Sequence, residues 1–233
     1  MKFVISSLIL AKYPTLQIGL VVAKDITNSA SDSTSSRVLR LEENRARTKS
    51  RKAKLEAHQR IALWRDAYSS FGVDPSRCHP AAESLLRQVL KTGRLSRINK
   101  LVDLANAVSL RSMLPIAVWD LDRVEGDMVI RFARGDEHFR EIGSSQTLSP
   151  DPGEVIYADG REALSRRWNW RASDKTKILL TTSDALLTVE GIGNMGREYL
   201  EHTTRELAAL IQDMCGGKVL WYFLDKDNPL AEY

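Results

Sequence analysis

The order in which helical and strand-like segments follow one another most constrains the fold of this chain. Beyond Pro115 the sequence divides into short apolar or alternating runs separated by turn dipeptides such as Gly126-Asp127. Helical patterns precede this region, and one helix (195–214) and one strand follow it. Helices and strands are therefore grouped, which predicts an α+β fold and disfavours a regular βαβ repeat. The strands expected in and after this region are 116–119, 128–133, 154–157, 165–171, 177–181 and 219–224.

The first residues predict two more strands. Two β-rich runs, 3–10 and 16–22, flank a connection that contains Pro14, and we expect them to form a pair. The first run holds two serines and ends at Lys12, so it resembles neither an export signal nor the ~20 apolar residues of a membrane helix. The chain has two cysteines, which cannot form a disulfide scaffold. We therefore expect reduced thiols, a cytoplasmic location and no membrane association.

Positive charge is concentrated in one segment. The formal net charge is +4, but residues 37–60 hold nine Lys or Arg against three Glu, a local charge of +6. We expect a loop over 28–36 and then one helix over about 38–70, whose C-terminal half is docked. The N-terminal half would face solvent or a polyanion. A solvated helix with surplus basic residues is the alternative.

Two further helices are predicted, over 80–93 and 99–111. In the second, Asn99, Asp103 and Asn106 fall on one face at spacings of four and three. Asn and Asp are poor helix formers, so this polar stripe indicates a ligand contact. Side chains that cap the helix and bond to their neighbours would give the same pattern.

Residues 166–171 read Arg-Arg-Trp-Asn-Trp-Arg and hold two of the five tryptophans of the chain. On a strand, one side would carry Arg166, Trp168 and Trp170, and the other Arg167, Asn169 and Arg171. One side could stack or pack, and the other could hold a phosphate, a ribose or a carbonyl. The alternative is a pair of core tryptophans with arginines lying over the rings.

Several common catalytic motifs are absent. The sequence has no Gly-x-x-x-x-Gly-Lys-Ser/Thr phosphate loop and no Gly-x-Ser-x-Gly nucleophile elbow. The four histidines form no His-x-x-x-His pair, and we expect no metal and no cofactor. Cys78 precedes His79, but neighbours in sequence do not face each other on a helix, so we interpret Cys78 as structural.

Several segments resemble the B3/4 tRNA-binding domain, known as the editing module of the phenylalanyl-tRNA synthetase β subunit. Residues 97–108 (RINKLVDLANAV) and 114–123 (LPIAVWDLDR) carry the resemblance, followed by 129–133 and 154–159 with Gly135, Glu137 and Gly143 between them. The Arg/Trp segment, residues 73–77 and the N-terminal runs look like freestanding B3/4 proteins. The resemblance implies a single domain over 1–233, with N-terminal strands and a basic helix (1–72) before a B3/4 core (73–233).

The resemblance also implies a sandwich-like sheet layer flanked by helices, and hydrolysis of the ester in a mischarged aminoacyl-tRNA. Such a protein would act in trans as a deacylase, with tRNA and transiently a synthetase as partners, and would not charge tRNA itself. The chain departs from the synthetase pattern at Ala117, where that family has the histidine of its editing site. The amino acid recognised and the catalytic apparatus stay open, as does the oligomeric state.

The site residues follow from this resemblance and from the residue chemistry. An aminoacyl ester is already activated, so the site need only position water and polarise the carbonyl. We expect Asn106, Asp103 and Arg171 to be catalytic and Asn99, Asn169, Trp168, Trp170 and Arg167 to bind substrate. Arg45, Arg47, Lys49, Arg51, Lys52 and Lys54 would contact tRNA phosphates. Asp120 and Asp122 would join the site or cap a turn, and Arg131 and Glu137 would match the family or pair structurally.

Three classes of function therefore remain open from the sequence. The first is an aminoacyl-tRNA deacylase. The second is a non-catalytic tRNA- or RNA-binding module, for which Ala117 is the best argument. The third is a protein that binds an amino acid or related metabolite in the same pocket.

Overall fold

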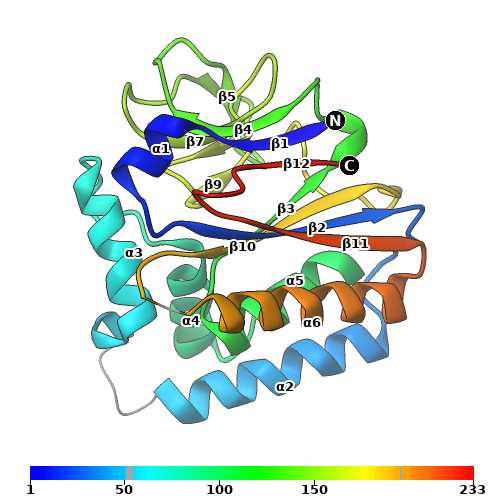
Figure 1. The fold of residues 1–233 in the computed structure, drawn as a ribbon. Helices are drawn as coiled ribbons and strands as arrows, with labels where there is room; N and C mark the ends of the chain where they lie inside the picture. Colours follow the sequence, from blue (N-terminus) through cyan, green and yellow to red (C-terminus); the bar gives the residue numbers. More distant parts are fainter. Residues whose placement is uncertain (51–54, 195) are drawn as a thin grey trace.

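The computed structural model describes residues 1–50, 55–194 and 196–233. Two four-stranded sheets lie face to face, and helices cover the outer face of one of them, giving a layered α+β arrangement (Figure 1). The α+β class and the layered sheets flanked by helices are thereby confirmed. The helices are α1 (Ser7–Lys12), α2 (Ser33–Ser50), α3 (Gln59–Ser70), α4 (Ala81–Thr92), α5 (Lys100–Ser112) and α6 (Arg197–Cys215).

The first sheet has the order β12 (Leu230–Glu232), β1 (Lys2–Ile5), β4 (Met128–Phe132), β7 (Val155–Ala158), with β1 and β4 parallel. The second is antiparallel throughout, in the order β11 (Lys218–Leu224), β2 (Gln17–Lys24), β10 (Ala185–Gly191), β3 (Ile116–Asp120). Two small hairpins, β5 (Phe139–Arg140) with β6 (Thr147–Leu148) and β8 (Ser165–Arg166) with β9 (Arg171–Ala172), complete the strands. Two 3-10 turns are Leu55–Ala57 and Leu121–Arg123.

The central strand β2 shows why the layers form. Its side chains alternate, so Ile18 and Leu20 pack between the two sheets while Val21 and Ala23 pack against the helices. A Cβ atom on Gly19 would lie 1.8 Å from Thr204 Oγ1, so only glycine lets α6 approach the sheet this closely. The neighbouring strand β10 is buried along its whole length because both of its faces are covered.

The N-terminal prediction is wrong in one respect. The runs 3–10 and 16–22 do not pair, because β1 joins the first sheet and β2 the second. The six-residue helix α1 lies between them. Its N-cap is Ser6, whose side chain accepts a hydrogen bond from the Ile9 amide.

The basic helix also differs from its prediction. Helix α2 begins at Ser33, inside the expected loop, and a second helix, α3, begins at Gln59 instead of one helix running over 38–70. The N-terminal half of the region is docked as well, because Leu39 and Ala46 are buried against α4 and α5. Helices α4, α5 and α6 confirm their predictions within a few residues.

Two predicted strands are wrong, and four of the strands in the described residues were not predicted. Residues 165–171 form a hairpin with its turn at 167–170, and 177–181 form no strand. The unpredicted strands are β10, at the centre of the second sheet, β12 at an edge of the first, and the short pair β5 and β6. Across the parts of the chain that the structure covers, no helix combines the length and the apolar composition needed to cross a bilayer.

Candidate functional site

A cavity of about 410 Å³ lies between α5, β3 and the β8–β9 hairpin. Most of its lining is apolar, including Val102 of α5, Ile116 and Trp119 of β3, and Ile178. Ile98 and Ile142, which also line it, are more than half exposed. The cavity brings together four of the predicted site residues and the position at which the sequence departs from its resemblance: Asn106, Asn169, Trp170, Arg171 and Ala117.

The hairpin separates the two tryptophans that a strand would have placed on one side. Arg167 and Trp168 have φ angles of 48° and 66°, in the left-handed region, so the chain turns back sharply here. Trp168 is fully buried, packs edge-on against Trp64 with ring centroids 5.0 Å apart, and does not line the cavity. Trp170 stays half-buried and lines the cavity.

Two guanidinium groups lie over the Trp170 ring. The centre of the Arg167 guanidinium is 4.8 Å from the ring centroid and that of Arg171 is 4.7 Å. Arg171 is exposed and pairs with Glu141 at 3.0 Å, while Arg167 points away to Cys78 Sγ at 2.8 Å and to Asp151. The alternative of core tryptophans under arginines therefore holds in part for each ring: Trp168 lies in the core, and the two arginines lie over the half-buried Trp170. Of the two arginines, only Arg171 lines the cavity.

Asn169 connects the cavity to a buried polar network. Its Oδ1 accepts from the Tyr68 hydroxyl at 2.8 Å and from the Ala81 amide at 3.0 Å, at the first residue of α4. Its Nδ2 donates to Glu190 Oε2 at 2.7 Å. The Ala81 amide can only donate, so a flipped side chain that placed Nδ2 at this point would lose that hydrogen bond. One N–H of Nδ2 is left over for the cavity that Asn169 lines.

Glu190 is fully buried behind Asn169 and was not predicted as a site residue. Its Oε1 accepts from the Tyr157 hydroxyl at 2.6 Å and from Thr188 Oγ1 at 3.3 Å. Burial raises the pKa of the Glu190 carboxyl to about 7, although the hydrogen bonds from Tyr157, Asn169 and Thr188 act to lower it. The signal in the sequence is a single acid within the otherwise apolar run 185–192.

The polar stripe of α5 divides between two roles. Asn99 is the N-cap of the helix: its Oδ1 accepts from the Val102 amide at 3.0 Å and its Nδ2 donates to the Ile178 carbonyl. Asp103 is fully buried and accepts from the Ile98 amide at 3.1 Å. Neither lines the cavity, so capping explains both. Asn106 lines it, is half-buried, and has no side-chain hydrogen bond to another described residue.

Other residues singled out from the sequence have structural partners. Asp120 is buried, accepts from the Asp122 amide at 3.2 Å and from Thr182 Oγ1 at 2.6 Å, and caps the turn after β3. Arg131 pairs with buried Glu137. Burial would raise the pKa of Glu137, but hydrogen bonds from the Arg134 and Gly135 amides and from Arg131 bring it down to about 2. These contacts stabilise the turn after β4.

The predicted phosphate contacts that the structure describes lie away from the cavity. Arg45, Arg47 and Lys49 lie on α2, on the far side of the helical layer from the sheets (Figure 1). Arg45 pairs with the buried Glu42 at 2.8 Å. Arg51, Lys52 and Lys54 lie outside the described residues.

Two other kinds of site receive no support within the described ranges. No group of three His, Cys, Asp or Glu side chains there is arranged to hold a metal ion. Residues 191–196 have the spacing Gly-x-Gly-x-x-Gly of a dinucleotide-binding loop. However, β10, which ends at Gly191, runs antiparallel to both of its neighbours, so the parallel βαβ unit that this loop requires is missing.

Comparison with known proteins identifies the family. The family described as "B3/4 domain" matches residues 63–216, about two thirds of the chain. The chain belongs to the B3/4 domain family. The matched segment contains α4, α5, β3, the β8–β9 hairpin and β10, and thus the cavity and the buried network. Helix α2 precedes it.

Curated relatives of this chain include phenylalanine–tRNA ligase beta subunits. That of Fusobacterium nucleatum is 25% identical over 164 residues, covering 60% of this chain and 20% of the relative. That of Dickeya dadantii is 28% identical over 171 residues, covering 62% of this chain and 21% of the relative. The chain thus spans about a fifth of the length of these relatives. A solved N-terminal fragment of the phenylalanyl-tRNA synthetase beta subunit from Pyrococcus horikoshii is similar at a TM-score of 0.47 and 11% identity, covering 96% of this chain and 54% of that chain.

Proposed function

We propose that the B3/4 protein hydrolyses the ester bond of mischarged aminoacyl-tRNA, acting in trans on tRNA that a synthetase has charged. The observation that carries the proposal is the cavity in which Asn106, Asn169, Trp170 and Arg171 meet. Its apolar lining suits the side chain of an amino acid, and its polar groups are hydrogen-bond donors and amides. Membership of a family whose relatives are subunits of a tRNA ligase supports tRNA as the carrier.

The geometry suits catalysis by positioning. The free N–H of Asn169 and the guanidinium of Arg171 are donors for the ester carbonyl, on which negative charge develops during attack by water. Asn106 faces the same space from α5 with an amide that no described residue engages, so it can orient the water or the terminal ribose. Trp170 and the Arg171 guanidinium stacked on it both line the cavity and would supply the planar groups that contact the terminal adenosine.

Three of the residues with predicted catalytic or binding roles no longer need those roles. Asn99 and Asp103 make capping contacts and lie outside the cavity, as does Trp168 in the core. We therefore propose Asn106 and Arg171 as the groups that act on the substrate, and Asn169 as a donor whose direction the buried network fixes.

The test is deacylation across a panel of correctly and incorrectly charged tRNAs. We expect one mischarged species to be lost, and Arg171→Ala and Asn106→Ala to abolish its loss. Both side chains are peripheral to the core, so thermal unfolding of the two variants should match the parent. Arg140→Ala, which removes an exposed arginine outside the cavity, is the matched control and should keep full turnover.

A second function has an observation of its own. Ala117 lines the cavity, and the residues that line it include no histidine, aspartate or glutamate. A module that binds the tRNA terminus without hydrolysis would fit this lining. Tight binding of charged tRNA with no turnover of any species in the panel would favour it over the deacylase.

A further inference from the structure

A second hollow, of about 660 Å³, lies between α2, the C-terminal end of α4 and the segment that leads to α5. Its walls carry arginines, hydroxyls and amides: Ser36, Arg40 and Asn44 from α2, Gln88 and Thr92 from α4, and Arg94, Ser96 and Arg97 after it. Helix α2 precedes the family-matched segment and α4 lies inside it, so the family match alone does not predict this groove.

The acidic side chain that lines the groove is already neutralised. Glu43 is 2% exposed and accepts two hydrogen bonds from the Arg97 guanidinium, at 2.7 and 3.0 Å, and one from the Leu95 amide at 2.8 Å. Glu42, its neighbour on α2, is also buried and pairs with Arg45 and Arg111. Neither carboxylate is therefore available to attract a cation at the groove.

Unlike Arg97, which is paired with Glu43, two other arginines at the groove are uncompensated. Arg40 and Arg94 are exposed on opposite walls, and neither pairs with a carboxylate among the described residues. Arg47 reaches across from α2, since a Cβ on Gly93 would lie 4.0 Å from its Nη1. Lys91 is exposed in the last turn of α4, next to Thr92 in the sequence. The residues that the structure does not describe, 51–54 and 195, contain no acid and so cannot supply a carboxylate partner.

We infer that the groove between α2 and the end of α4 is a binding surface for the phosphodiester backbone of RNA. Arginine forks with hydroxyl and amide donors are the groups that contact phosphates. The lining has no aromatic ring on which a base could stack, so contact would be with the backbone and independent of sequence. It also lacks an exposed apolar anchor of the kind that an acidic protein partner would require.

This inference rests on the proposed function for its choice of RNA, and it extends the binding surface beyond the basic helix. The groove adds Arg40 and Arg94 to the cations predicted on α2, and places them on two walls where they can hold one strand between them. The cavity would receive the charged terminus while the groove holds a distant part of the backbone.

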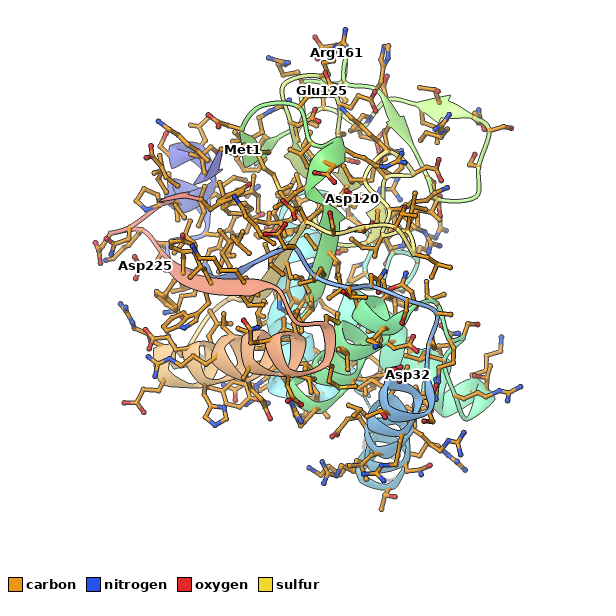
Figure 2. The ribbon with its side chains drawn as sticks, turned by 90° about the vertical axis from the view of Figure 1, so that its right-hand side faces the viewer. Met1, Asp32, Asp120, Glu125, Arg161 and Asp225 are labelled. Carbon is orange, nitrogen blue, oxygen red and sulfur yellow. The ribbon has the colours of Figure 1, made fainter. Side chains whose placement is uncertain are left out.

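The test measures binding of deacylated tRNA as a function of salt, so it does not depend on hydrolysis. The double variant Arg40→Glu/Arg94→Glu should weaken binding about tenfold or more near 0.1 M salt and lower the salt slope by about two units. Arg40→Lys/Arg94→Lys, which keeps both charges, should retain the slope. The matched control is Arg134→Glu/Arg161→Glu. It makes the same charge change at exposed side chains, and Figure 2 places Arg161 at the opposite end of the molecule from Asp32 and α2.

The outcomes separate this inference from the proposed function. Unchanged tRNA binding in the groove variant, or equal weakening in the control, would overturn the groove whatever the deacylation panel gives. Binding of poly-glutamate as tightly as tRNA would overturn the assignment to RNA in favour of an acidic protein. Weakened binding in the groove variant alone, with a parent-like unfolding temperature, supports the inference even if no tRNA is deacylated.

Discussion

Replacing Glu190 by glutamine should remove a pH dependence of stability that the buried network builds into the wild-type protein. The pKa of the carboxyl is raised from the model-compound value of 4.5 to about 7 by burial. The folded state therefore binds a proton more tightly than the unfolded chain. Stability from this group is fully present below pH ~4.5 and is lost as the pH rises through about 7.

The size of the effect follows from the shift. Each pKa unit corresponds to about 1.4 kcal/mol, so the wild type should lose roughly 3 kcal/mol of unfolding free energy between pH 4.5 and pH 8 from this group. Glutamine fits the same contacts. Its oxygen can accept from Asn169 Nδ2, while its amide can donate to Tyr157 and Thr188, whose hydroxyls rotate to accept.

The assay is urea unfolding of the wild type and Glu190→Gln at pH 5 and pH 8. The unfolding free energy of Glu190→Gln minus that of the wild type should increase by about 2.5 kcal/mol from pH 5 to pH 8, slightly less than the full effect because the unfolded carboxyl is already mostly ionised at pH 5. The same difference at both pH values would refute the reasoning, because it would mean that the carboxyl does not titrate differently in the two states. Glu141→Gln, at a half-buried acid outside this network that pairs with Arg171, is the control and should keep the wild-type fall in stability between the two pH values.

Three further predictions concern stability. Trp168→Ala should cost about 3–5 kcal/mol in chemical denaturation, because the ring is fully buried against Trp64, and a cost below about 1 kcal/mol would contradict this packing. Gly19→Ala should destabilise strongly by the clash with Thr204, and Thr204→Gly should partly restore the unfolding temperature if the close approach is the cause. The pKa of Glu137 is lowered from 4.5 to about 2 in the folded state, so the wild type should lose unfolding free energy as the pH falls from about 4.5 towards 2. Glu137→Gln should lose less over the same pH range, and equal losses in the two proteins would argue against this.

The elements that could be predicted from the sequence are those whose pattern is local. Helix α4 has apolar residues at helical spacing and ends at Gly93, whose φ of 82° suits glycine, so both its face and its end could be read. Strand β10 could not, because it is buried on both faces and its apolar run is interrupted by Thr188 and Glu190. The β8–β9 turn was missed because Arg167 and Trp168 adopt left-handed angles without the glycine or asparagine that signals them.

For the candidate site, too, a local pattern identified some residues but could not distinguish their roles. Asn106 was identified from helical periodicity, and it lines the cavity. Asp103 and Asn99 share its face but lie one and two turns nearer the helix start, where backbone amides need caps. Residue type alone does not distinguish a capping asparagine from one that faces a cavity. Only the packing of β3 and the hairpin against α5 decides which part of the stripe is covered.

The lining of the cavity limits what kind of chemistry it can support. With Ala117 in place of a histidine, the ionisable side chains that line the cavity are Arg171 and Lys177, and its described lining holds no histidine, aspartate or glutamate. Three acids contact lining residues instead: Glu141 pairs with Arg171, Asp174 pairs with Lys177, and Glu190 accepts a hydrogen bond from the Asn169 amide. Under the proposed deacylase function, catalysis would therefore depend on fixed donors and on the reactivity of the ester, with Glu190 fixing the direction of one of those donors.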